Sequence, residues 1–272
     1  MRLACGQIRV EAGDVEANVD RAVDAVARAA SEGADLVVLP EIFNVGYFAF
    51  DRYARRAEPL DGRTLTRISD AAREHDVGVL AGSIVEDIAA TGETDGAHPT
   101  ADEGLANTSV LFDREGERRL VYRKHHLFGY ESAEAELLTP GERIDVAEFE
   151  GFTVATTTCY DLRFPELYRE LAEQGATLVC VPSAWPYPRV EHWELLPEAR
   201  AVENQQYVAT ANGSGSFEDA TLVGRSTVHD PWGTVLASSS DDPALITAEL
   251  DPGRVERVRE EFPAWRDRRR DP

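Results

Sequence analysis

The hydrophobic positions of the chain follow two spacings, one typical of helices and one typical of strands. Residues 14–31 carry valine and alanine at helical spacing behind Asp14, a residue type that often caps a helix. Residues 35–40 form a continuous apolar run that ends at Pro40, which is typical of a strand covered on both faces. Strands and helices alternate in this way along the chain, and the alternation predicts an α/β fold.

The same spacings predict the elements of the rest of the chain. We expect helices over residues 14–31, 63–75, 164–174 and 191–204. We expect strands over residues 2–10, 35–40, 77–85, 108–113, 118–124, 152–158, 177–182, 207–212, 222–230, 234–238 and 244–249. Residues 87–104 are polar and aperiodic, which predicts a solvated loop.

No linker or internal repeat divides the chain, so we expect a single domain over residues 1–272. Residues 251–272 read as a C-terminal helix followed by an arm, a type of segment that often docks on a partner subunit. No stretch reaches the roughly 18–20 apolar residues that cross a bilayer, and Met1 leads directly into a strand pattern. We therefore expect a cytoplasmic protein without a membrane partner.

The chain is strongly acidic, with a formal net charge of −22. Such a field repels nucleic acid, which we exclude as a partner. The 28 basic residues comprise 27 arginines and a single lysine, Lys124. One hypothesis for the acid excess is a salt-loaded cytosol, where surface carboxylates hold water and their repulsion is screened. A biased nucleotide composition would explain the loss of lysine but not the excess of acid.

Three residues with complementary chemistry each follow a predicted buried strand: Glu41, Lys124 and Cys159. A thiol is nucleophilic as its thiolate, and a nearby cation with a carboxylate that takes the proton provides that activation. Taken singly, such a cysteine is often a small buried apolar residue, and such a glutamate is often a helix cap. Cys5, Cys159 and Cys180 are too few and too scattered for a disulfide framework or a zinc site, so we expect no metal.

The sequence around these residues resembles a known family. Residues 159–166 read Cys-Tyr-Asp-Leu-Arg-Phe-Pro-Glu, residues 39–41 read Leu-Pro-Glu, and residues 122–128 read Tyr-Arg-Lys-His-His-Leu-Phe. These blocks, in this order, closely resemble the signature blocks of the nitrilase superfamily of carbon-nitrogen hydrolases. The resemblance implies a four-layer α-β-β-α sandwich that dimerises through its helices. It also implies chemistry that needs no cofactor.

The resemblance also implies roles for individual residues. Glu41 would be the general base, Lys124 the cation that stabilises the oxyanion, and Cys159 the nucleophile, with the backbone N–H of Tyr160 as a second oxyanion donor. A further glutamate of the family, six residues before the proline of a Pro-Gly turn, corresponds to Glu134. The nearby Glu131 and Glu136 are alternatives to Glu134, because all three lie in one short segment. A compact ammonium that arginine cannot replace would explain why one lysine persists.

The substrate is expected to be a small amide that carries a carboxylate. Segments beginning at Ser183, His192, Asp230 and Glu261 look like the omega-amidase branch, which deamidates 2-oxo dicarboxylic acid monoamides. Arg163 and, more weakly, Arg189 suit the acid end, Trp185 would wall the pocket, and Tyr47 and Phe43 would line it. The alternatives are an ion pair of Arg163 with Asp161 or Glu166, and core packing for the aromatic residues. His125 and His126 are given no part in the mechanism.

Three other functions remain open at this stage. An N-carbamoyl-amine or N-carbamoyl-acid hydrolase would use the same three residues with a differently shaped pocket, and a nitrilase is a further alternative. A catalytically idle scaffold or regulatory protein is the alternative from another class. The complete set of Glu41, Lys124 and Cys159 favours an amidase over an idle scaffold.

Overall fold

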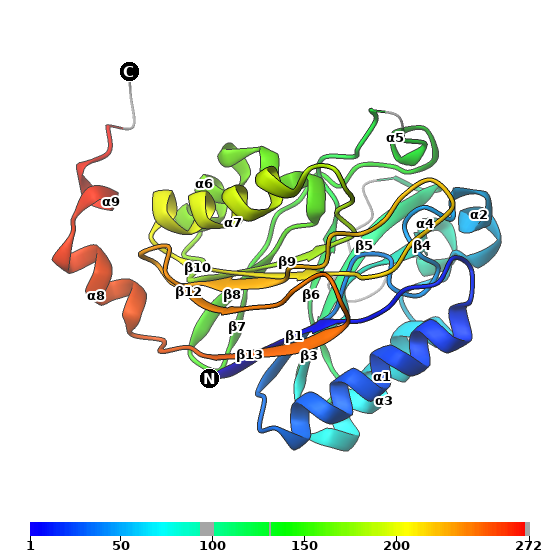
Figure 1. Ribbon diagram of the computed structural model, residues 1–272, viewed down its shortest axis with the longest axis horizontal. Coiled ribbons are helices and arrows are strands. Elements are labelled where there is room, and N and C mark those ends of the chain that lie inside the picture. Colours follow the sequence, from blue (N-terminus) through cyan, green and yellow to red (C-terminus); the bar gives the residue numbers. More distant parts are fainter. Residues whose placement is uncertain (93–100, 131, 270–272) are drawn as a thin grey trace.

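Two β-sheets lie face to face in the computed structural model, and helices cover the outer face of each sheet (Figure 1). The structure describes residues 1–92, 101–130 and 132–269. Helices α1 (Val15–Ser31) and α3 (Arg63–His75) lie on one side, and α6 (Pro165–Glu173) and α7 (Val190–Asn204) on the other. The predicted four-layer α-β-β-α sandwich is therefore confirmed.

The first sheet has the strand order β13-β1-β2-β3-β5-β4, with β6 paired to β5. Its strands are β1 (Arg2–Gln7), β2 (Leu36–Val38), β3 (Gly78–Leu80), β4 (Ile84–Asp87), β5 (Leu105–Phe112), β6 (Arg118–Arg123) and β13 (Ala244–Glu249). The second sheet has the order β12-β11-β10-β9-β8-β7. Its strands are β7 (Ala147–Phe149), β8 (Phe152–Thr156), β9 (Leu178–Ser183), β10 (Tyr207–Asn212), β11 (Thr227–His229) and β12 (Val235–Ser238).

The side chains of each central strand alternate between two apolar interfaces. In β1, Leu3 and Cys5 join the core between the sheets, whereas Ala4 joins the core between the first sheet and helices α1 and α3. In β9, Cys180 faces the core between the sheets, and Val179 faces α6 and α7. Burial on both faces explains why these strands appear in the sequence as continuous apolar runs.

The predicted strand over residues 77–85 is wrong in one respect, because it is broken into β3 and β4. Gly82 lies at the break with φ +44°, and a Cβ atom there would lie 1.9 Å from the carbonyl oxygen of Pro40. Ser83 donates its backbone N–H to that carbonyl at 3.2 Å and accepts the Ile42 N–H on its hydroxyl at 2.8 Å. The break therefore holds the turn that carries Glu41.

Other elements differ from the prediction mainly at their ends. The first strand ends at Gln7, and only β11 forms within the expected strand over residues 222–230. The expected loop over residues 87–104 begins with the short helix α4 (Ile88–Thr91), and its residues 93–100 lie outside the described residues. Sequence periodicity missed the short elements η1 (Phe50–Arg52), α2 (Tyr53–Arg56), α5 (Glu134–Leu137) and β7.

The C-terminal segment forms α8 (Arg254–Glu261) and the short α9 (Ala264–Asp267), which extend to one side of the sandwich (Figure 1). Residues 270–272 of the expected arm lie outside the described residues. Throughout the described ranges, every helix is too short or too polar to cross a membrane.

Candidate active site

Glu41, Lys124 and Cys159 come together at one edge of the two sheets. Glu41 follows β2, Lys124 follows β6, and Cys159 begins the 3-10 helix η2 (Cys159–Arg163) after β8. All three residues are buried. Because Glu41 and Lys124 follow the first sheet while Cys159 follows the second, the site is built across the interface between the sheets.

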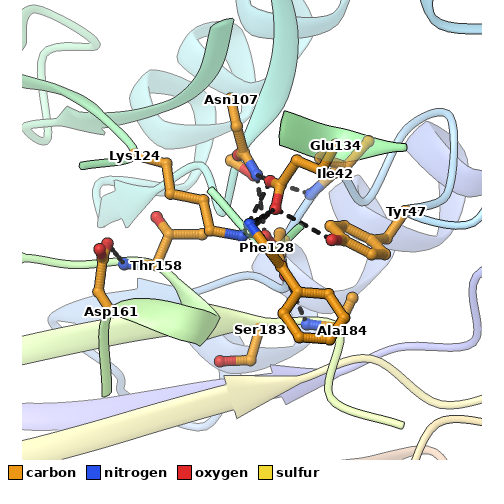
Figure 2. Close-up of polar contacts among 12 residues, drawn as sticks. Ile42, Tyr47, Asn107, Lys124, Phe128, Glu134, Thr158, Asp161, Ser183 and Ala184 are labelled. Atoms are coloured by element: carbon orange, nitrogen blue, oxygen red, sulfur yellow. Dashed lines mark hydrogen bonds and ion pairs between the residues drawn. The ribbon is translucent and has the colours of Figure 1, made fainter. Parts of the chain in front are cut away.

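Lys124 lies between two carboxylates (Figure 2). Its Nζ donates to Glu41 Oε1 at 2.8 Å and to the two oxygens of Glu134 at 2.8 and 2.9 Å. The Lys124 side chain has an exposed fraction of 0%. Burial lowers the pKa of a lysine, but the two glutamates dominate here and raise the pKa of Lys124 well above its ordinary value. Lys124 is therefore a permanently charged ammonium.

Glu134 is held by four groups besides the ammonium. Tyr47 donates its hydroxyl to Glu134 Oε2 at 3.0 Å, and the backbone N–H of Phe128 donates to the same oxygen at 2.8 Å (Figure 2). Asn107 Nδ2 donates to Glu134 Oε1 at 3.0 Å. The backbone N–H of Glu134 donates to Ser132 Oγ at 3.3 Å. The structure thus places Glu134 in the cluster and leaves Glu136 exposed, while Glu131 lies outside the described residues.

Glu41 joins the ammonium to the thiol through its two oxygens. Oε1 accepts from Lys124 and, at 2.8 Å, from Asn107 Nδ2. Oε2 accepts from the backbone N–H of Ala184 at 2.9 Å, and the carboxylate lies near enough to the Cys159 thiol for each group to alter the pKa of the other. This carboxylate is therefore placed to take the thiol proton.

The nucleophile lies in a strained turn that a buried aspartate stabilises. Cys159 has φ +46°, an unusual backbone conformation for a residue with a side chain. Asp161 Oδ2 accepts from the Thr158 N–H at 2.9 Å and from the Tyr122 hydroxyl at 2.6 Å. Asp161 Oδ1 accepts from the His126 N–H at 2.9 Å. Since Tyr122 and His126 flank Lys124, Asp161 ties the thiol turn to the segment that carries the ammonium.

The electrostatics of the site raise the pKa of both the carboxyl group and the thiol. Burial raises the pKa of Glu41, as does Glu134, and Lys124 lowers it by a smaller amount than burial raises it. Burial and then the Glu41 charge raise the pKa of Cys159 well above its ordinary value, against a lowering by Lys124. The resting cysteine is therefore a thiol.

A pocket that is open to solvent lies over the thiol. Its wall is mainly aromatic and cationic, and its lining comprises Tyr47, Phe48, Phe128, Cys159, Tyr160, Arg163, Ala184, Trp185, Pro186 and Arg189. A concave site with aromatic walls and a few polar groups is the usual form of a small-molecule site. Phe43, by contrast, packs in the core under α1 and α3 and does not line this pocket.

The two arginines of the pocket wall are held by aromatic rings. The Arg163 guanidinium lies 4.9 Å from the Trp185 ring centroid, and that of Arg189 lies 5.5 Å from the Phe128 ring centroid. Arg163 Nη2 also lies 3.2 Å from His192 Nδ1. Within residues 1–92, 101–130 and 132–269, no carboxylate lies within 4.0 Å of either guanidinium. The alternative ion pair of Arg163 with Asp161 or Glu166 does not form.

Trp185 serves both expected purposes, since it lines the pocket and packs on Trp193 with ring centroids 5.5 Å apart. Its indole N–H donates to the Arg189 carbonyl at 2.9 Å, which fixes the start of α7 beside the pocket. Tyr160 lies at the second position of η2, where a backbone N–H has no partner within the helix. All predicted site residues except Phe43 therefore surround one pocket or its buried floor.

Sequence reasoning missed Asn107, Phe128 and Phe48 as parts of the site. Asn107 is a fully buried polar residue in β5, but it is followed by Thr108 and Ser109, which are also buried, so the sequence does not distinguish it. Phe128 and Phe48 carried no signal either, because aromatic residues in loops are common. Among the described residues, no cluster of three or more His, Cys, Asp or Glu side chains is arranged to hold a metal ion.

Comparison with known proteins agrees with this geometry. The carbon-nitrogen hydrolase family matches residues 2–260. A 2-oxoglutaramate amidase of Paenarthrobacter nicotinovorans is 37% identical over 242 residues, 88% of this chain and 79% of that protein. Omega-amidase NIT2 of Homo sapiens is 33% identical over 280 residues, 99% of this chain and 95% of that protein.

A solved structure of the amidase from Nesterenkonia sp. AN1, with acrylamide added at the active site cysteine, has a TM-score of 0.80 and 31% identity. The match covers 96% of this chain and 98% of that chain. The expected resemblance to the nitrilase superfamily, and to amidases within it, is thus confirmed. The chain belongs to the carbon-nitrogen hydrolase family.

Proposed function

We propose that this protein is a cysteine-dependent amidase that releases ammonia from a small 2-oxo acid amide with a free carboxylate, as an omega-amidase does. The observation that carries the proposal is the buried cluster of Glu41, Lys124 and Cys159 at the floor of a pocket whose wall holds two arginines that have no carboxylate partner among the described residues. The relatives named 2-oxoglutaramate amidase and omega-amidase support the same substrate class.

In the first half of the reaction, Glu41 takes the thiol proton while Cys159 Sγ attacks the amide carbonyl. The carbonyl oxygen becomes an oxyanion, which the Lys124 ammonium and the Tyr160 N–H stabilise. Protonation of Glu41 weakens its attraction for Nζ, so one ammonium proton can turn toward the oxyanion. The tetrahedral intermediate collapses to a thioester, and ammonia leaves with the proton that Glu41 had accepted.

In the second half, Glu41 takes a proton from water, and the resulting hydroxide attacks the thioester carbonyl. The same two donors stabilise the second oxyanion, and the thiolate leaves and regains its proton. The products are the carboxylic acid and the regenerated thiol. Glu134 keeps the ammonium in place throughout, because it contacts Nζ with both oxygens. We propose that this chemistry needs neither a metal nor an organic cofactor.

The pocket wall supports recognition of a carboxylate. Arg163 and Arg189 lie beside the thiol without an internal acid partner among the described residues, and a guanidinium binds a carboxylate through paired hydrogen bonds. Tyr47 and Trp185 complete the wall. This local positive charge offsets the repulsion that the net charge of −22 exerts on an acidic substrate.

The test is ammonia release from four substrate classes: 2-oxoglutaramate, plain aliphatic amides, N-carbamoyl compounds and nitriles. We expect the highest kcat/KM with 2-oxoglutaramate, and no release from Cys159→Ala. A preference for a carbamoyl compound or a nitrile would contradict the omega-amidase assignment. Folded protein that releases ammonia from none of them would support an idle scaffold instead.

We propose further that residues 1–272 form one carbon-nitrogen hydrolase domain that assembles as a homodimer. Exposed apolar side chains on α7 and near the C-terminal helices support an interface there, namely Leu195, Val202, Trp232 and Phe262. Trp232 and Phe262 lie in contact, with ring centroids 5.7 Å apart. Light scattering gives the mass in solution, and a monomer at all concentrations would contradict the dimer.

We propose that the protein is cytoplasmic, because its three cysteines are free and buried, as suits a reducing compartment. The acidic surface also supports a source with high internal salt.

A further inference from the structure

Asn107 joins the two carboxylates of the active site. It lies in β5, and its side chain is fully buried. Its Nδ2 donates to Glu41 Oε1 at 2.8 Å and to Glu134 Oε1 at 3.0 Å (Figure 2). The same two oxygens accept from Lys124 Nζ, each at 2.8 Å. The two carboxylate oxygens therefore each accept from the same two donors, the charged Lys124 ammonium and the neutral Asn107 amide.

The charge balance explains why a second donor is needed. Two buried carboxylates repel each other, and the single ammonium of Lys124 neutralises only one of the two charges. A second cation would also lower the basicity of Glu41, whereas an amide stabilises the carboxylate without adding charge. Each carboxylate receives one of the two amide protons. Asn107 therefore holds the pair together and leaves Glu41 able to accept a proton.

The orientation of the amide is fixed by its surroundings. Asn107 Oδ1 is buried and has no hydrogen-bond partner among the described residues. Reversing the amide would place that oxygen against two carboxylate oxygens, which is repulsive. The Asn107 backbone carbonyl accepts the Lys124 N–H at 2.8 Å, and this bond persists whatever side chain stands at the position. Side-chain variants therefore test the amide alone.

We propose that Asn107 is a positioning residue that keeps Glu41 ionised and directed at the Cys159 thiol. The inference rests on the proposed function, in which Glu41 is the general base. Glu41 is faced by Lys124 from the end of β6, Glu134 from α5, Cys159 from η2, and Tyr47 and Tyr53 from the segment before and within α2. Of these groups, only the Lys124 ammonium carries positive charge.

Removal of the amide changes the ionisation of Glu41 in a known direction. Burial and Glu134 already raise the pKa of Glu41. Without the Asn107 donor, the ionised form loses a hydrogen bond and the pKa rises further. A larger fraction of the enzyme then carries a protonated base near neutral pH. The fall of kcat/KM on the acid side therefore moves to higher pH.

The experiment measures this acid-side fall in the wild type and in Asn107→Leu, which has a similar volume but no donor. We expect an upward shift of about one to two pH units, because a hydrogen bond to a charged group is equivalent to about 10- to 100-fold in the ionisation equilibrium. Asn107→Ala adds no atoms and provides a variant that the fold accommodates without overpacking. Its shift has the same sign.

Asn204→Leu is the matched control. Asn204 is a buried amide at the end of α7 that donates to the Arg200 carbonyl at 3.0 Å, and its Oδ1 has no partner among the described residues. A general loss of packing would affect the stability of both leucine variants. Only loss of the amide at position 107 moves the pH profile.

Alkylation of Cys159 by iodoacetamide provides a second readout that needs no substrate. Its rate reports how readily the thiol loses its proton, and Cys159→Ala corrects for Cys5 and Cys180. We expect the alkylation profile of the Asn107 variants to move in the same direction as kcat/KM. A folded Asn107→Leu or Asn107→Ala with wild-type pH dependence in both assays would overturn the inference. Failure of the wild type to hydrolyse any amide would instead overturn the proposed function, and alkylation would still test Asn107.

Discussion

The charges at the floor of the pocket and the charges on its wall are arranged in opposite ways. Lys124 on the floor is fully buried and contacts Glu41 and Glu134 at 2.8 Å each. Arg163 and Arg189 on the wall are partly exposed, and in the described parts of the chain neither lies within 4.0 Å of a carboxylate. Burial lowers the pKa of Arg163 and outweighs the raising effects of Tyr160 and Cys159, and the charge of Arg189 adds a smaller lowering.

The floor and the wall of the pocket therefore use charge in different ways. A buried charge with partners is fixed before the substrate arrives, and such preorganised groups stabilise a developing oxyanion without reorganising. A wall charge without an internal partner gains its partner when an anionic ligand enters. In the proposed mechanism, the floor carries out the reaction and the wall selects the substrate. Variants of the two regions should change different kinetic constants.

The largest effect is expected at the nucleophile. Cys159→Ala should lower kcat by on the order of 10⁶-fold, as does loss of other covalent nucleophiles. Ammonia release with 2-oxoglutaramate measures this, and circular dichroism shows whether the variant is folded. Activity within tenfold of the wild type would show that the floor acts through another group. Cys180→Ala, a change in the core between the sheets, is the matched control.

Lys124→Arg should have the next largest effect, about 100- to 1,000-fold in kcat, with a smaller change in KM. The planar guanidinium places its charge differently from a compact ammonium, and the site around Lys124 has no exposed surface to accommodate it. Steady-state kinetics separate kcat from KM. Near-full activity would show that the oxyanion role assigned to Lys124 is wrong, although membership of the family would stand.

Arg163→Ala should mainly raise KM, by about 10- to 100-fold for an amide that carries a carboxylate, because a charge-assisted hydrogen bond is lost. The KM for an uncharged amide of similar size should change much less. Arg189→Ala should act in the same direction. Arg55→Ala, an exposed arginine of α2, is the control. If KM rose equally for charged and uncharged amides, Arg163 would shape the pocket wall and would not bind the substrate carboxylate.

The pH dependence of kcat/KM should reflect the ionisation of Glu41 on the floor of the pocket. Burial and Glu134 raise the pKa of Glu41, and the base is active when ionised. As the pH falls through this raised pKa, Glu41 becomes protonated and kcat/KM falls, whereas above it the rate is maintained. The fall should therefore lie above the ordinary glutamate value of about 4.3. A profile that stays flat down to that value would contradict the assigned environment of Glu41.

The smallest effect on activity is expected from salt, which acts on the surface rather than on the site. If the acidic surface reflects a high-salt source, the melting temperature should rise by several degrees from low to multimolar salt, because repulsion between carboxylates is screened. Thermal unfolding monitored by circular dichroism measures this. An unchanged melting temperature would remove the halophile hypothesis.

The layers of the fold and the residue types of the site could be predicted from the sequence, whereas the detailed geometry of the chain could not. The alternation of apolar strands and amphipathic helices was sufficient for the α/β class, and the motifs around Glu41, Lys124 and Cys159 for the family. The break at Gly82 was missed, because its cause is the carbonyl of Pro40, which is remote in sequence. Periodicity within one segment cannot report an approach by another segment.

The choice among the three clustered glutamates depended on the resemblance in the same way. Local composition treats Glu131, Glu134 and Glu136 alike. What distinguishes Glu134 is burial against Lys124, Tyr47 and Asn107, which are brought together by tertiary packing. Asn107 was missed for the same reason, because its burial and its contacts with Glu41 and Glu134 also depend on tertiary packing.

The most direct measurement is mass spectrometry of the enzyme after brief incubation with 2-oxoglutaramate and acid quenching. The account predicts that the peptide containing Cys159 gains the mass of the acyl group, that is, of the substrate less ammonia, and that the adduct is absent from Cys159→Ala. Turnover with no acyl adduct on this peptide, together with an active Cys159→Ala, would contradict the thioester mechanism.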